Sequence, residues 1–138
     1  MGGRKGFLTM GGVSCFFCDV LANQRDRIVA ENDLAFAMRD GFPVTSGHSL
    51  FIPRRHVKDY FGLTREEVDA INRLMAEQKN VLEAEDKTID GFNIGMNCGE
   101  SAGQTVFHCH VHLIPRRTGD VERPRGGVRH IIPGKGSY

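Results

Sequence analysis

The longest amphipathic pattern in the chain runs from Thr64 to Asp86. Apolar residues recur there mostly at intervals of three and four, which is the spacing of one face of an α-helix. The segment starts with a capping-box signature, in which Thr64 is the N-cap and Glu67 follows three positions later. We therefore predict one long helix whose apolar stripe packs against a sheet. The stripe consists of Val68, Ile71, Leu74, Met75, Val81 and Leu82.

Shorter apolar runs on both sides of this helix predict strands, separated by turn-forming residues. A short helix is expected over 14–22, a hairpin turn over Glu31–Asp33, and loops over 40–47 and 97–103. Because strands precede and follow the long helix without βαβ alternation, we predict an α+β fold with a mainly antiparallel five-stranded sheet. The five strands are expected over 27–31, 34–39, 48–53, 91–97 and 105–115.

Length and charge narrow the class of protein. The 138 residues fit one domain, and 18 basic against 17 acidic residues give no case for nucleic-acid binding. No apolar stretch reaches the roughly 18 residues of a membrane span. Residues 1–13 lack the apolar core of a signal peptide and are expected to form a flexible lead before a single domain, 14–138, with an irregular C-terminal tail. These features predict a cytoplasmic protein.

Three histidines alternate with apolar residues in the last predicted strand. Side chains alternate between the two faces of a strand, so His108, His110 and His112 are expected to project from one face. Three imidazoles on one face have no packing rationale, because a strand that only needed polarity would use Thr, Lys or Glu. The pattern therefore indicates a functional site at which each ring has a separate task.

The loop before the histidines is rich in glycine and in hydrogen-bond donors. Gly99 and Gly103 allow a close approach of the backbone to an anion, and Asn97, Gln104 and Thr105 add side-chain donors. Donors that converge on developing negative charge are what phosphoryl chemistry requires. The loop and the histidines together predict an enzyme that acts on phosphates.

The segments 93–97 and 103–115, with the earlier segment 47–56, resemble the histidine-triad (HIT) family in order and spacing. This resemblance implies a compact α+β domain, usually a homodimer, that acts on nucleoside phosphates. Some members cleave nucleoside phosphoramidates, some cleave dinucleoside polyphosphates, and some transfer nucleotidyl groups. The motif does not decide between these branches.

The resemblance also implies roles for individual residues. His110 is expected to attack the α-phosphorus and form a covalent nucleotidyl-histidine, while His112 hydrogen-bonds the phosphate. Asp40 matches the ribose-binding position, and the expected substrate is a purine nucleotide that yields an AMP-type product. Residues expected to contact the phosphates or the leaving group are Asn97, Gly103, Gln104 and Thr105.

A Cys-x-x-Cys pair, Cys15 and Cys18, precedes the first strand. This spacing suits a metal site, and zinc needs two further ligands, although two reduced cysteines on a small helix would also explain the pair. The layout is similar to that of zinc-containing HIT proteins, which implies that His56 and His108 complete the set. Such a Cys₂His₂ site would be closed, tetrahedral and structural.

Four questions stay open at this point. The arginine-rich tail after Pro115 favours a longer anionic leaving group, as in a dinucleoside polyphosphate. A nucleotide- or partner-binding module without turnover is an alternative, as is a hydrolase whose histidines and Asp40 hold a catalytic metal. His48 is expected either to brace the active site from behind or to be a core histidine.

Overall fold

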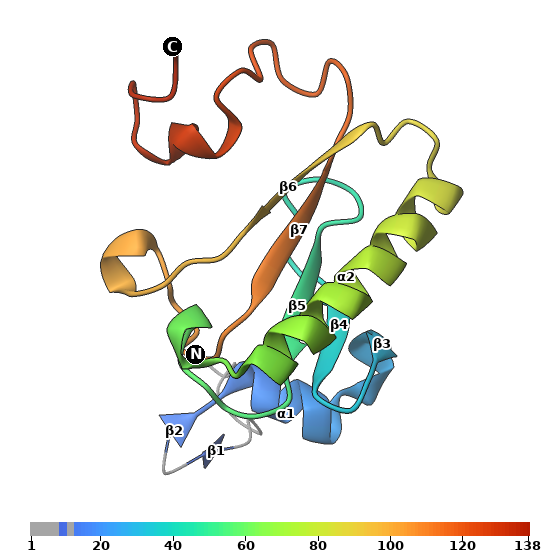
Figure 1. Ribbon diagram of the computed structural model, residues 1–138, viewed down its shortest axis with the longest axis vertical. Helices are drawn as coiled ribbons and strands as arrows, with labels where there is room; N and C mark the ends of the chain where they lie inside the picture. Colours follow the sequence, from blue (N-terminus) through green and yellow to red (C-terminus); the bar gives the residue numbers. More distant parts are fainter. Residues whose placement is uncertain (1–8, 11–12) are drawn as a thin grey trace.

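The computed structural model describes residues 9–10 and 13–138. An antiparallel sheet in the order β3-β4-β5-β7-β6 forms its centre, and the long helix α2 lies across one face of it (Figure 1). The predicted α+β fold is therefore confirmed. The elements are β1 (Thr9–Met10), β2 (Val13–Ser14), α1 (Phe16–Asn23), η2 (Arg25–Arg27), β3 (Ile28–Glu31), β4 (Ala35–Arg39), β5 (Ser49–Pro53), η3 (Tyr60–Gly62), α2 (Arg65–Glu85), β6 (Gly91–Gly95), η4 (Glu100–Ala102), β7 (Val111–Arg116) and η5 (Gly127–Ile131).

The two faces of the sheet are covered by different elements. Ala35 and Ala37 of β4 belong to the core cluster that contains α2, whereas Phe36 and Met38 belong to the cluster that contains α1. Because both faces are buried, β4 and β5 consist of almost continuous apolar residues. The candidate site lies on the α1 side, where His112 of β7 is paired with Leu50 of β5.

The first turn of α2 is fixed by the predicted capping box. The Glu67 amide donates to Thr64 Oγ1 at 3.1 Å, and the Glu67 carboxylate accepts from the Thr64 amide at 2.9 Å. The same carboxylate accepts from the guanidinium of Arg55 at 2.8 Å. Since Arg55 follows β5, this ion pair ties the start of the helix to the sheet.

One member of the predicted helical stripe is misplaced. Ile71, Leu74 and Leu82 are buried, but Val81 is 38% exposed, so its assignment to the core is wrong. The buried positions at this end follow the row of residues four apart, Ala70, Leu74, Gln78 and Leu82. Val81 precedes Leu82 by one position and lies outside this row.

The last strand is shorter than predicted. It begins at Val111 instead of at residue 105, so the expectation of three histidines on one strand is wrong: only His112 lies in β7. The segment before it leaves the sheet because the Cys109 amide donates to Val57 O, beyond the end of β5, at 2.7 Å. His108 and His110 are therefore held by loop contacts.

Part of the expected N-terminal lead carries secondary structure. Thr9–Met10 pairs antiparallel with Val13–Ser14, whereas residues 1–8 and 11–12 of that lead lie outside the described residues. In the described part of the chain, neither α-helix combines the length and the apolar character needed to cross a membrane.

Glu67→Gln tests the anchor of α2. The Arg55 hydrogen bond, more than any other contact, lowers the pKa of Glu67 below 4.5. The ionised carboxylate thus stabilises the folded chain above the unfolded-state pKa, and this contribution is lost as the pH falls through the lower folded-state value. We expect E67Q to reduce the free energy of unfolding by about 1.5–3 kcal/mol near neutral pH.

Urea unfolding followed by circular dichroism measures this loss, which should shrink at about pH 3. Glu66→Gln is the matched control, because Glu66 is an exposed neighbour in the same turn and should change stability by less than about 0.5 kcal/mol. Equal losses in both variants would contradict the assignment.

Candidate active site and metal centre

A cavity of about 810 Å³ opens on the α1 side of the sheet. It lies between the end of β4, the loop before η4 and the segment that leads into β7. The sequence analysis assigned seven residues to catalysis or substrate binding, and all of them line this cavity. They are Asp40, Asn97, Gly103, Gln104, Thr105, His110 and His112.

His110 projects one ring nitrogen into the cavity because the other is held by the backbone. Its Nδ1 lies 2.8 Å from the carbonyl oxygen of His108. A carbonyl only accepts hydrogen bonds, so Nδ1 carries the proton. Burial lowers the pKa of His110 below 6.5, so the ring is neutral near pH 7 and Nε2 keeps its lone pair. The Phe17 ring packs against this imidazole with centroids 4.8 Å apart.

His112 is oriented by a second chain of hydrogen bonds. The Val44 amide donates to His48 Nδ1 at 3.1 Å, and His48 Nε2 lies 2.8 Å from His112 Nδ1. Burial lowers the pKa of both histidines, that of His112 to about 4, so both rings are neutral. His48 Nε2 therefore donates, His112 Nδ1 accepts, and His112 is left with a proton on Nε2. Of the two roles expected for His48, the structure therefore agrees with the one in which it braces the site from behind.

Gly47 places His48 at this position. Its φ of 91° lies in the left-handed region, and an added Cβ would lie 3.1 Å from Leu82 Cδ2 and 3.2 Å from Pro115 Cγ. Only glycine suits both the backbone conformation and the close approach to α2 and β7. The loop can therefore turn into β5 with His48 buried behind His112.

Asp40 forms a cluster with His48 and His112. Its Oδ1 accepts from the Phe42 amide at 2.8 Å, and its Oδ2 lies 3.4 Å from His48 Nε2. Ligand atoms of Asp40, His48 and His112 lie within 4.8 Å of one another, as in a metal site. However, the Val44 amide leaves His48 Nε2 protonated, without a lone pair for a cation. The cluster is a hydrogen-bonded chain, which argues against a catalytic metal there.

The Gln104 side chain holds the loop together. It is 2% exposed; its Oε1 accepts from the Gly99 amide at 2.8 Å, and its Nε2 donates to Lys58 O at 2.7 Å and to Val106 O at 3.2 Å. These contacts engage the whole amide, so it offers the cavity no free donor. Asn97 and Thr105 are exposed and can present theirs.

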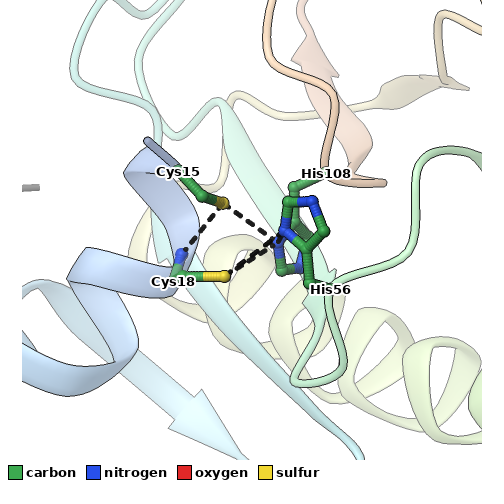
Figure 2. Close-up of side chains that lie close together, drawn as sticks. All are labelled: Cys15, Cys18, His56 and His108. Carbon is green, nitrogen blue, oxygen red and sulfur yellow. Dashed lines mark hydrogen bonds between the residues drawn. The ribbon is translucent and has the colours of Figure 1, made fainter. Parts of the chain in front are cut away.

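The second cluster joins α1 to the loops that flank the sheet. Figure 2 shows Cys15 and Cys18 pointing toward His56 and His108. His108 Nδ1 lies 3.3 Å from Cys15 Sγ and 3.5 Å from Cys18 Sγ. His56 Nδ1 lies 3.4 Å from Cys18 Sγ and 3.2 Å from His108 Nδ1. The structure thus brings together all four predicted metal ligands.

These separations fit the edges of a zinc coordination tetrahedron. Bonds of about 2.3 Å to sulfur and 2.0–2.1 Å to nitrogen place tetrahedral ligand atoms roughly 3.3–3.8 Å apart. Burial, together with the hydrogen bond and charge of Cys15, raises the pKa of the Cys18 thiol to about 12. A cation is what would hold such a sulfur as a thiolate. The donor set and its geometry therefore suit zinc.

His108 belongs to this cluster and not to the cavity. Its Nε2 donates to Pro53 O at 2.8 Å, which leaves the lone pair on Nδ1, on the side of the sulfurs. The residue is completely buried. Its ring thus serves the cluster while its carbonyl orients His110.

Comparison with known proteins identifies the family. The family model for the HIT domain matches residues 22–119. The chain belongs to the histidine-triad (HIT) family. A solved HIT family protein from Bacillus anthracis is 42% identical, with a TM-score of 0.70 over 75% of this chain and 73% of that protein.

Two further HIT structures bear on the two clusters. A hypothetical histidine triad nucleotide-binding protein from Sulfolobus tokodaii is 32% identical, with a TM-score of 0.69 over 77% of this chain and 71% of that protein. A Zn-bound histidine triad family protein from Mycobacterium smegmatis is 33% identical, with a TM-score of 0.70 over 78% of each chain. A zinc-containing branch is thus plausible for this HIT protein.

Sequence reasoning missed two contributors to the site. Phe17 was not singled out, although its place inside Cys-Phe-Phe-Cys puts it next to whatever the cysteines approach. The Val44 amide is a backbone group, so the identity of residue 44 does not indicate its role. Only the folded loop shows that this amide donates to His48.

We predict the tautomers of the three histidines. Two-bond ¹H–¹⁵N correlation spectra near neutral pH should show His110 protonated on Nδ1, and His48 and His112 protonated on Nε2. In His48→Phe, the fixed tautomer of His112 should be lost because its donor is gone. His110 is the internal control and should not change; an Nε2 proton on His110 would contradict the geometry.

Proposed function

We propose that this HIT protein hydrolyses nucleotides at the α-phosphate, through a covalent nucleotide on His110. The substrate is a nucleoside phosphoramidate or a dinucleoside polyphosphate. One observation carries the proposal: the Nδ1–H of His110 is tied to the His108 carbonyl, so a neutral Nε2 lone pair faces a nucleotide-sized cavity. HIT proteins bind nucleotides, which makes a phosphorus atom the natural partner of this nitrogen.

In the first step, the Nε2 lone pair attacks the α-phosphorus and an N–P bond forms. The bond to the leaving group breaks, and the leaving atom takes that electron pair and, if it is an amine, a proton from solvent. The His112 Nε2–H donates a hydrogen bond to a phosphoryl oxygen, where negative charge accumulates. His110 becomes positively charged in this step, and the hydrogen bond to the His108 carbonyl stabilises that charge.

In the second step, water attacks the same phosphorus and the N–P bond breaks. The electron pair returns to His110 Nε2, and the proton of the water leaves to solvent. The product is a nucleoside monophosphate, and the ring is restored to its starting tautomer. His112 donates to the phosphoryl oxygen in both steps, because its Nδ1 stays bound to His48.

The rest of the cavity suits the nucleoside. Asp40, at its wall, is proposed to accept hydrogen bonds from the two ribose hydroxyls, which favours a ribonucleotide. Phe16, Met38 and Leu50 give an apolar surface for a purine base, so AMP is the expected type of product. Asn97, Thr105 and the backbone at Gly103 are proposed to contact phosphate oxygens or the leaving group, while Gln104 keeps their loop in place.

We further propose that Cys15, Cys18, His56 and His108 hold one structural zinc ion. When bound, zinc would cross-link α1 to the segment before β7 and take no part in the reaction. The site has four protein donors and hence no open position for substrate. His108 would then be doubly fixed, by the metal and by Pro53 O, and its carbonyl would stay aimed at His110.

A homodimer is proposed from the sheet edge. β6 is an outer strand, and its Ile94 is 53% exposed. The backbone donors and acceptors of an outer strand favour pairing with another strand, and a second copy of β6 offers the same edge.

The first functional prediction concerns His110→Ala. It should lower turnover of adenosine phosphoramidate by at least about a thousandfold, because the attacking lone pair is lost, while circular dichroism and thermal stability stay close to wild type. Acid-free quenching with α-³²P-labelled substrate should trap a labelled protein in wild type and none in the variant.

His130→Ala is the matched control, since His130 bonds to Arg125 O in the tail. It should leave both turnover and labelling unchanged. Full activity in His110→Ala would end the proposal, whereas nucleotide binding without turnover in wild type would favour the non-catalytic module.

The second functional prediction concerns zinc. Purified protein should contain about one zinc per chain by elemental analysis, and Cys18→Ser should lose most of it and melt several degrees lower, because one ligand is gone. Cys98 is half-buried and lies outside the cluster, so Cys98→Ser should keep the zinc content and the melting temperature of wild type. Equal zinc contents in the two variants would contradict the ligand set.

A further inference from the structure

A row of paired residues crosses the sheet beneath the cavity that holds His110 and His112. His112 of β7 is paired with Leu50 of β5, and Leu50 is paired with Met38 of β4. Met38 is paired in turn with Ile28 of β3. Neighbouring strands lie about 4.8 Å apart, so the row spans roughly 14 Å. A nucleotide whose phosphate lies beside His112 can therefore lay its base over Leu50 and Met38, with the far edge of the base toward β3.

Arg27 lies at that far end of the row. It directly precedes Ile28, and its side chain lines the same cavity. The guanidinium carbon lies 5.1 Å from the centroid of the Phe16 ring, which lines the cavity too. Among the described residues that form the cavity wall, no other is Lys or Arg. The positive charge therefore lies at the nucleoside end, away from the histidines.

The side chain of Gln24 fixes the direction of this guanidinium. Gln24 Nε2 donates to Asp19 Oδ2 at 2.6 Å, which leaves Gln24 Oε1 to accept from Arg27 Nη1 at 3.4 Å. Arg27 Nη2 reaches the turn after β4, where an added Cβ at Gly41 would lie 3.0 Å from it. These contacts hold the guanidinium across the cavity wall, between α1 and the turn.

Arg27 differs from nearby arginines in having no carboxylate partner. Arg25 pairs with Glu31 at 2.6 Å, and Arg54 pairs with the same carboxylate at 2.5 Å. Within residues 9–10 and 13–138, Arg27 forms no ion pair, and Gln24 is the one acceptor of its hydrogen bonds. Its Nε and Nη2 donors are therefore available to acceptors on a ligand.

An arginine at the edge of a purine distinguishes guanine from adenine. A guanidinium offers donors only, and guanine presents two adjacent acceptors, O6 and N7, on one edge. Adenine presents N7 beside its N6 amino group, which is itself a donor and would face the guanidinium without a hydrogen bond. The apolar surface of Met38 and Leu50 accepts both purines alike, so the choice between them depends on Arg27.

We infer that Arg27 recognises the O6 and N7 edge of guanine, and that guanosine 5′-phosphates are the preferred substrates of the cavity. This inference rests on the proposed function and makes GMP, in place of AMP, the preferred product. Adenine nucleotides remain substrates, because the apolar surface and Asp40 serve them equally well.

Calorimetric titration of the protein with GMP, IMP, 7-deaza-GMP and AMP tests this contact. GMP should bind at least about fivefold more tightly than AMP, because the guanidinium gains a second acceptor. IMP lacks the 2-amino group but keeps O6 and N7, so it should bind within about twofold of GMP. In 7-deaza-GMP the N7 acceptor is replaced by carbon, and this nucleotide should bind at least about threefold more weakly than GMP.

Arg27→Met should abolish the preference for guanine. Methionine keeps an apolar contact with Phe16 but has no N–H donor. The affinity for GMP should fall by at least about fivefold more than the affinity for AMP, so that the two nucleotides bind about equally. Arg25→Met is the matched control, because Arg25 pairs with Glu31 and does not line the cavity. It should keep the wild-type ratio of the two affinities.

Turnover of guanosine and adenosine 5′-phosphoramidates, measured on the same protein, separates the two proposals. If GMP binds more tightly than AMP but neither phosphoramidate is cleaved, the proposed function fails while the recognition of guanine stands. If both are cleaved but AMP binds as tightly as GMP, the role of Arg27 is refuted while the chemistry at His110 stands. If Arg27→Met weakens both nucleotides equally, Arg27 contacts a group that both share, and the inference is overturned.

Discussion

The account depends on one hydrogen bond, from Nδ1–H of His110 to the main-chain carbonyl of His108. Without it, a neutral imidazole could place its proton on either nitrogen, and Nε2 would lack a fixed lone pair. The bond is reliable because the acceptor cannot move: the His108 ring is completely buried and donates to Pro53 O. The four-residue cluster thus reaches His110 through the backbone oxygen of His108, and Phe17, which lies between the two cysteines, packs against the same ring.

The tautomer of His112 is fixed in the same way, by a hydrogen-bonded chain that begins at a backbone group. A main-chain donor at Val44 fixes His48, and His48 in turn fixes His112 with the opposite tautomer to that of His110. One ring therefore presents a lone pair, and the next presents a proton, beside the cavity that both residues line. Two adjacent imidazoles of identical chemistry acquire complementary tasks from the polarity of the backbone groups behind them.

The sequence predicted those features that depend on local pattern. The α+β class followed from the order of the apolar runs, and the start of α2 followed from Thr64 and Glu67, whose capping box forms as expected. The residues assigned to the cavity and the four proposed ligands do come together, because motif spacing preserves the arrangement in space. Their functions stay predictions until they are measured.

Features that depend on tertiary contacts could not be predicted in this way. The sequence pattern of the segment before Val111 is typical of a strand. In the structure this segment lies outside the sheet, because the Cys109 amide donates to Val57 O. In the sequence, Gln104 is a candidate donor beside the histidines. In the structure, its side-chain amide is already hydrogen-bonded to three backbone groups. Arginines in the tail suggest an anionic leaving group; only the folded chain shows Arg125 and Arg129 turned onto Tyr138. These partners are backbone groups, or residues that only folding brings together, so no sequence motif identifies them.

The stereochemistry of hydrolysis at phosphorus tests the central claim most directly. A single-isomer adenosine 5′-phosphorothioamidate, cleaved in ¹⁸O-labelled water, gives a chiral product whose configuration can be assigned by ³¹P NMR. Two successive in-line displacements, the first by His110 and the second by water, predict net retention of configuration. Net inversion would mean that water attacks the substrate directly, and it would contradict a covalent nucleotidyl-histidine.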